Sequence, residues 1–181
     1  MNAFDQYTLS PGALASFTEP TPDLQRNYRT RGMMDGIGKS DDAGRWKYSL
    51  CDLVSIWISD RLSMHGRAMD RRIALRRGVS LAQTVINGAL KNYRGIPLGH
   101  PRYMVILSDG FSDDGRVHGQ SLKEVSGLHE LDADAFDQAE IIDIHRLAKT
   151  IPVAIMSLLI VAHENEFDDI GLPGLVEGLA D

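Results

Sequence analysis

The chain has 181 residues, of which 43% are hydrophobic and 24% charged, and its formal net charge is −6. These values suit a soluble globular protein of one domain or two small ones. The single cysteine excludes an intramolecular disulfide and a zinc site built on paired cysteines. The longest apolar stretch, residues 151–162, is too short to cross a bilayer, and no signal-peptide pattern begins the chain. We therefore expect a cytoplasmic protein with no membrane contact.

The charges divide unevenly along the chain. Residues 1–100 contain 14 Lys and Arg against 9 Asp and Glu, a balance of +5, whereas residues 101–181 contain 5 against 16, a balance of −11. The first part can attract phosphate locally, while the second part weakens non-specific attraction to nucleic acid. The change of sign also indicates a boundary between two parts.

A helix over Asp23–Arg31 has clear start and stop signals. Thr21 offers a capping hydroxyl, Pro22 suits the first helical position, and Gly32 can adopt the left-handed conformation that ends a helix. The arginines of this segment are expected to stay in solvent, so Leu24 and Tyr28 are the residues expected to face inward.

A shorter helix over Gly12–Phe17, opened by Ser10 and Pro11, precedes a proline-containing turn. Helix, turn and second helix in this order are typical of a helix-turn-helix whose second helix reads the DNA groove.

The Gly-rich polar segment 35–44 closes on the basic and aromatic residues 45–48, which predicts a β-hairpin carrying Arg45 and Lys47. Ser49 then has the position of an N-cap, with Asp52 three residues later. The helix predicted from Ser49 to His65 is strongly apolar, and Trp57 is expected in its core-facing side rather than on a stacking surface.

These segments resemble the DNA-binding head of the MerR family. The family pattern R-x-Y-x-x-x-G-L-L corresponds to RNYRTRGMM at residues 26–34, and G-Y-R-x-Y-x-x-x-D-L corresponds to GRWKYSLCDL at residues 44–53. The chain departs from the pattern at Arg29, where the family has an acidic residue, and in a hairpin lengthened by polar residues. Such departures favour a divergent member, of the kind found among phage and mobile-element regulators.

The resemblance implies a winged helix-turn-helix that binds double-stranded DNA as a homodimer. Helix Asp23–Arg31 would enter the major groove, and its arginines would contact phosphates or guanine edges. The hairpin would hold the flanking phosphates. The DNA-binding residues expected on this basis are Thr21, Arg26, Tyr28, Arg29, Arg31, Arg45 and Lys47.

The arginine-rich segment 66–77 allows two interpretations, a solvated helix face or a second phosphate-binding surface, and we favour the first because no aromatic residues are interleaved. Residues 78–81 (GVSL) resemble the start of the last helix of the MerR head, with Ser80 as its cap. The Gly- and Pro-rich segment 95–101 is predicted as a linker.

The second part is expected to be a small α+β unit. Arg102–Leu107 predicts a strand, Ser108–Gly119 a hairpin-like loop, and residues 139–144 either a strand or the start of a helix. Val153–Ala162 is apolar on all sides and is expected to be buried, in the core or against a second subunit. The acidic residues Asp109, Asp113 and Asp114 lack the spacing of a calcium loop.

The fold class predicted is therefore mainly α with small β: a winged helix-turn-helix with a helical extension over residues 1–94, then an α+β dimerisation or regulatory domain over residues 102–181. No catalytic constellation, cofactor motif or metal-ligand spacing predicts an enzyme. The leading hypothesis is a sequence-specific transcriptional regulator. The alternative is a protein-interaction adaptor or antirepressor, with a protein partner bound through the acidic C-terminal half.

Overall fold

A computed structural model describes residues 3–63, 70–99, 101–111, 117–132, 136 and 138–169. It is mainly helical with small antiparallel sheets, as the composition and patterns predicted. The chain forms two compact units. The first unit comprises the described residues of Met1–Ile86 and of Ile151–Asp181, and the second unit comprises those of Asn87–Thr150.

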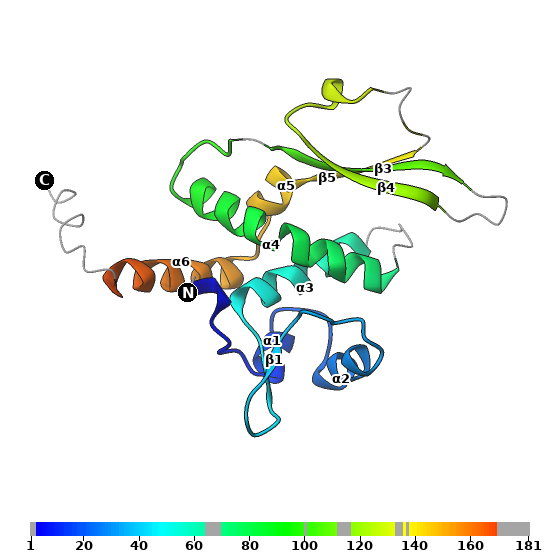
Figure 1. Ribbon diagram of the computed structural model, residues 1–181. Coiled ribbons are helices and arrows are strands. Elements are labelled where there is room, and N and C mark those ends of the chain that lie inside the picture. The colour runs from blue at the N-terminus through cyan, green and yellow to red at the C-terminus, as the bar shows by residue number, and fades with distance from the viewer. Residues whose placement is uncertain are drawn as a thin grey trace, which may run out of the picture. The chain divides into compact units, whose positions relative to one another are not determined.

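The first unit begins with the 3-10 helix η1 (Ala3–Asp5) and two short helices, α1 (Pro11–Ala15) and α2 (Pro22–Thr30). A hairpin of β1 (Lys39–Ser40) and β2 (Trp46–Lys47) follows. Helix α3 (Leu50–Ser63) comes next, and its buried side includes Leu53, Ile56 and Trp57, which confirms the core position predicted for the tryptophan. Figure 1 shows α1, α2 and the hairpin on one side of α3.

Helix α4 is continuous from Arg71 to Tyr93, so the prediction that Ser80 caps a new helix is wrong. The Ser80 hydroxyl instead donates to the Arg76 carbonyl within the helix. Gly78 has a packing reason to be there: a Cβ at this position would lie 2.0 Å from the Ser55 carbonyl oxygen of α3. The sequence pattern predicted a helix start at this glycine. In the structure, the glycine instead lets the backbones of α3 and α4 lie close together.

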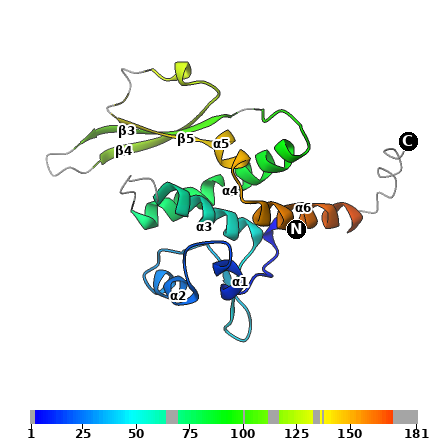
Figure 2. The same cartoon turned by 180° about the vertical axis from the view of Figure 1, so that it is seen from behind.

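Helix α6 (Val153–Asp169) belongs to the first unit, although it follows the second in sequence. It lies beside η1 in both views (Figures 1 and 2), and the rings of Phe4 and His163 are stacked with centroids 6.2 Å apart. Ile155 and Leu159 are buried. This packing joins α6 to η1, so the first unit is built from two separate segments of the chain.

Helix α6 is only partly buried within this chain, and burial of its other side against a second subunit stays a prediction. Val153 is 83% exposed and Val161 56% exposed, while Ile155 and Leu159 on the other side of the helix are fully buried. The sequence is apolar around the whole helix, but the packing covers one stripe of it. No helix in the described part of the chain is long and apolar enough to cross a membrane.

The second unit holds the end of α4 and a three-stranded antiparallel sheet in the order β4-β3-β5, visible in Figure 2. Its strands are β3 (Tyr103–Phe111), β4 (Val117–Val125) and β5 (Gln138–Asp143). The predicted loop over Ser108–Gly119 is therefore largely strand, with Phe111 opposite Val117. Asp113 and Asp114 lie outside the described residues.

Residues 139–144 contain both a strand and the start of a helix, because β5 passes directly into α5 (Ile144–Lys149). Asp143 makes this change of direction possible: its carboxylate accepts a hydrogen bond from the Arg146 backbone N–H at 2.9 Å and caps α5. The short 3-10 helix η2 (Leu128–Glu130) lies between β4 and β5 in sequence.

Candidate nucleic-acid interface

Helices α1 and α2 are held together by a buried amide rather than by an apolar pair. The Gln25 side chain is fully buried, and its Nε2 donates to the carbonyl oxygens of Pro11, at 3.0 Å, and Pro20, at 2.8 Å. Leu24, which was predicted to face inward, is 36% exposed. Sequence reasoning missed Gln25 because apolar periodicity does not identify a polar residue as a core position.

The turn before α2 is anchored by Asp60 of α3. Its carboxylate accepts a hydrogen bond from the Glu19 backbone N–H at 3.0 Å and forms a salt bridge with Arg71 of α4. Burial raises the pKa of Asp60, and the hydrogen bonds from Glu19 and Arg71 oppose that shift. A buried carboxylate satisfied in this way fixes the position of α2 relative to α3 and α4.

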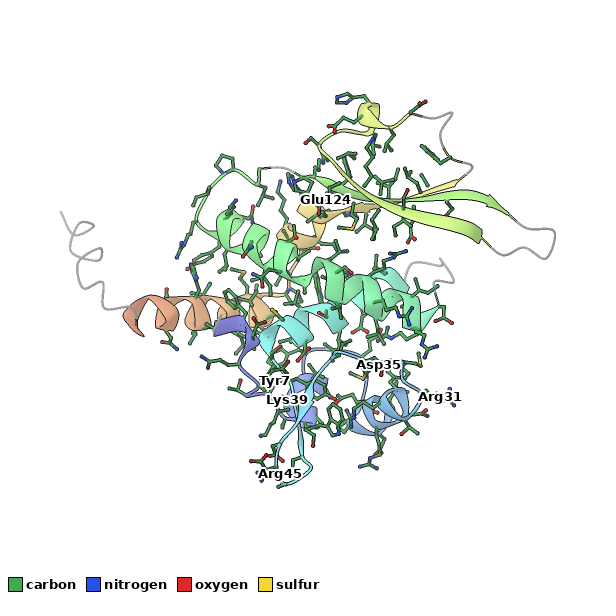
Figure 3. The ribbon with its side chains drawn as sticks, viewed as in Figure 1. Tyr7, Arg31, Asp35, Lys39, Arg45 and Glu124 are labelled. Carbon is green, nitrogen blue, oxygen red and sulfur yellow. The ribbon has the colours of Figure 1, made fainter. Side chains whose placement is uncertain are left out.

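Two exposed arginines, Arg26 within α2 and Arg31 directly after it, are the freely accessible cations of this segment. Arg26 pairs loosely with Asp23, at 3.5 Å, and its side chain is 76% exposed. Arg31 follows the last turn of α2, is exposed, and has no side-chain partner in the part of the chain that the structure describes. Figure 3 shows it at the end of the helix. Thr21 caps α2 as predicted, its hydroxyl accepting from the Leu24 backbone N–H at 3.3 Å.

Arg29 and Tyr28, two other predicted DNA contacts, are half-buried and lie against neighbouring elements. The Arg29 guanidinium donates to the Tyr48 hydroxyl and lies 4.6 Å from the centroid of the Trp46 ring. The Arg71 guanidinium lies 5.7 Å from the Tyr28 ring centroid. Both side chains therefore attach α2 to the hairpin and to α4, and neither belongs to the freely exposed face.

The hairpin places two lysines directly opposite each other. Its register pairs Lys39 with Lys47 and Ser40 with Trp46. Lys39 is exposed and Lys47 half-buried, and neither forms an ion pair within the described residues. Like charges in register across two strands destabilise the pair, so an anion bound here would relieve that repulsion. Sequence reasoning selected Lys47 but missed Lys39, because the register of the hairpin was unknown.

Arg45 occupies the tip of the hairpin, where Figure 3 shows it pointing away from the rest of the unit. It is tied to Asp41, whose carboxylate accepts from the Arg45 backbone N–H at 2.8 Å and from its Nε at 2.9 Å. The backbone hydrogen bond from Arg45 is the main reason that the pKa of Asp41 is lowered. The Arg45 charge is thus exposed but already paired.

The base of the hairpin is rigidly built around Tyr48, which is fully buried. Tyr48 exchanges two backbone hydrogen bonds of 2.9 Å with Leu9. Gly38 has φ +76°, and a Cβ there would lie 2.7 Å from the Tyr48 ring, so no larger residue fits. These contacts hold in place the backbone that carries Lys39 and Lys47.

Four of the predicted or newly found cations, Arg26, Arg31, Lys39 and Arg45, are thus exposed, and Lys47 is half-buried. Tyr28 and Arg29 instead turn toward neighbouring elements. Within the described residues, no group of three or more His, Cys, Asp or Glu is placed to hold a metal ion. Comparison with protein-family models, curated proteins and solved structures gave no match.

Proposed function

We propose that this protein is a sequence-specific DNA-binding transcriptional regulator with a winged helix-turn-helix of the MerR type. In this proposal α2 enters the major groove and the β1–β2 hairpin rests on the flanking phosphates. A homodimer, with two heads on a two-fold symmetric site, would double the number of base pairs read. A chain active in the cytoplasm fits the single unpaired cysteine.

The lysine pair of the hairpin is the observation that carries the proposal. Two ammonium groups held opposite each other, on a support fixed by Tyr48, create a site that phosphate oxygens would stabilise. Helix α2, with the exposed Arg26, and Arg31 directly after it lie in the same unit. In this proposal the cations of the helix contact base edges and the cations of the hairpin contact the phosphate backbone.

The test is selection of binding sites from a random DNA pool at two salt concentrations. The variants are Arg26→Ala/Arg31→Ala on α2 and Lys39→Ala/Lys47→Ala on the hairpin. Lys91→Ala/Arg94→Ala, which removes two exposed cations of the second unit, is the matched control. We expect an enriched palindromic motif that the α2 variant loses, weaker binding to every sequence for the hairpin variant, and no change in the control.

A protein-interaction adaptor or antirepressor is the second candidate function. It is favoured by the pairing of Arg26 with Asp23 and of Arg45 with Asp41, which reduces the positive charge available to phosphate. An interface of this kind responds little to salt, whereas DNA binding weakens steeply. A folded protein that enriches no motif and binds duplexes without salt dependence would favour the adaptor, and a partner would then be sought through the acidic half.

A further inference from the structure

Two exposed arginines at the start of α4 lie next to the end of α2. Arg72 Nη2 donates to the carbonyl oxygens of Arg31, at 3.5 Å, and Gly32, at 3.3 Å. Arg76, one turn further along α4, lines a shallow depression together with Met33 and Asp35, which follow α2. Arg31, Arg72 and Arg76 are all exposed and belong to backbone segments that meet at the end of α2; they are here called the α2–α4 arginine cluster.

The cluster has more positive charge than its surroundings balance. None of its three guanidinium groups forms an ion pair with a carboxylate in the described ranges of the chain. Two acidic residues lie beside it. A Cβ at Gly32 would lie 3.4 Å from Asp35 Oδ2 and 3.5 Å from Arg72 Nη2, and the Asp70 carboxylate accepts from the Arg72 backbone N–H at 2.8 Å. Arg72 and Arg76 are four residues apart on one helix face, where like charges repel. An anion bound between them would remove that repulsion.

Arg72 also changes the electrostatics at the end of α2. The carboxyl end of a helix carries partial negative charge on its unpaired carbonyl groups, which repels phosphate. The Arg72 guanidinium binds two carbonyls at this end and so covers the negative charge with a positive one. A DNA backbone that passes the end of α2 would meet cations instead of carbonyl oxygens.

We infer that the α2–α4 arginine cluster is a phosphate-binding site that extends the DNA interface from α2 onto α4. This inference rests on the proposed DNA-binding function. From the sequence, a solvated helix face was the favoured interpretation of residues 66–77; here Arg72 and Arg76 are assigned a role in binding phosphate. The site takes a backbone phosphate through charge-assisted hydrogen bonds from guanidinium groups. It contributes affinity but no base recognition.

The experiment measures how binding of a selected duplex and of an unrelated duplex depends on salt, between about 50 and about 200 mM. The full-length variants are Arg72→Gln/Arg76→Gln and the single Arg76→Gln, whose side chain has no partner to lose within the described residues. Lys91→Gln/Arg94→Gln is the control with equal charge. The slope of log K against log salt should fall by about 0.9 for each phosphate contact removed, roughly 1.8 for the double variant.

Comparing the binding losses of the two duplexes distinguishes loss of this phosphate site from loss of the base contacts proposed for α2. Loss of a phosphate contact should weaken both duplexes by the same factor, whereas loss of Arg26 and Arg31 should weaken the selected duplex more. A double variant with the wild-type slope, alongside an α2 variant that loses its motif, would overturn this inference and leave the proposed function intact. An equal fall in slope for the control would also overturn it. A wild-type protein that binds neither duplex would overturn both.

Discussion

At the scale of single residues, Gly78 is a position where the added Cβ of an alanine would clash with a neighbouring helix. Alanine favours a helix over glycine by roughly 1 kcal/mol, so Gly78→Ala would stabilise an isolated α4. In the folded protein its Cβ would lie 2.0 Å from the Ser55 carbonyl oxygen, a backbone atom that cannot move without displacing α3. We expect a net loss of about 1–3 kcal/mol in the free energy of unfolding, measured by urea denaturation.

Gly12 provides the matched control for this substitution. It lies in α1, and its nearest neighbour for a new Cβ is 4.0 Å away. Gly12→Ala should therefore be neutral or stabilise by a few tenths of a kcal/mol up to about 1 kcal/mol. Equal stability of the Gly78→Ala and Gly12→Ala proteins would contradict the close approach of α3 and α4.

Cys51 is a residue whose environment predicts a pH dependence. Burial raises the pKa of its thiol to about 12, with a further contribution from a hydrogen bond with Asp5. At pH 8 the reactive thiolate is then far scarcer than in the unfolded chain, where the ordinary value is 9.0. We expect alkylation by iodoacetamide to be at least about 100-fold slower in the native protein than in urea.

The sign of the linked stability change follows from the same pKa. Because the folded state holds the thiol proton more tightly, this stabilisation is complete below pH 9 and is lost progressively as the pH rises toward 12. The native alkylation rate should keep rising about tenfold per pH unit up to pH 10. A plateau near pH 9, or an unchanged rate in Asp5→Asn, would show that burial and Asp5 do not control this thiol.

At the scale of elements, the start of α3 depends on a reciprocal cap. The Ser49 hydroxyl accepts from the Asp52 backbone N–H at 3.1 Å, and the Asp52 carboxylate accepts from the Ser49 backbone N–H at 2.8 Å. Ser49→Ala should cost about 1 kcal/mol of unfolding free energy. Ser80→Ala, in the middle of α4, should change stability by less than about 0.5 kcal/mol, and thermal denaturation compares the two.

Elements with local signals were predictable from the sequence, and elements set by tertiary contacts were not. Thr21, Gly32 and Ser49 each act within their own helix end, and the structure has them in those roles. The role of Gly78 depends on its close approach to Ser55 of α3, a tertiary contact that local sequence does not show. In a single sequence, a glycine that permits close packing has the same appearance as a glycine that starts a helix.

The candidate interface was predictable to a similar extent. Residue type and spacing identified the cationic helix and hairpin. Whether a given arginine faces solvent depends on distant partners such as Tyr48, which turns Arg29 inward, and on strand register, which adds Lys39. Arg72 and Arg76 belong to a helix distant in sequence from α2, so only the fold places them beside Arg31.

At the scale of the whole molecule, α6 is expected to be essential for the first unit. Its residues Ile155 and Leu159 are buried, and its stacking on Phe4 covers the start of the chain. Burial of each such side chain contributes about 1.5–3 kcal/mol, a sum comparable with the whole stability of a typical domain. A chain ending at Thr150 should lose cooperative thermal unfolding and bind a hydrophobic dye. A chain ending at Asp169 should unfold like the full-length protein.

The interrupted path of the first unit also has a consequence for how the protein is made. The ribosome completes all of Asn87–Thr150 before α6, so the second unit can fold while Phe4 still lacks its cover. At roughly 5–20 residues per second, synthesis from Ile86 to Leu159 leaves that surface open for several seconds. During translation, we therefore expect the incomplete first unit to expose apolar surface of the kind that chaperones bind.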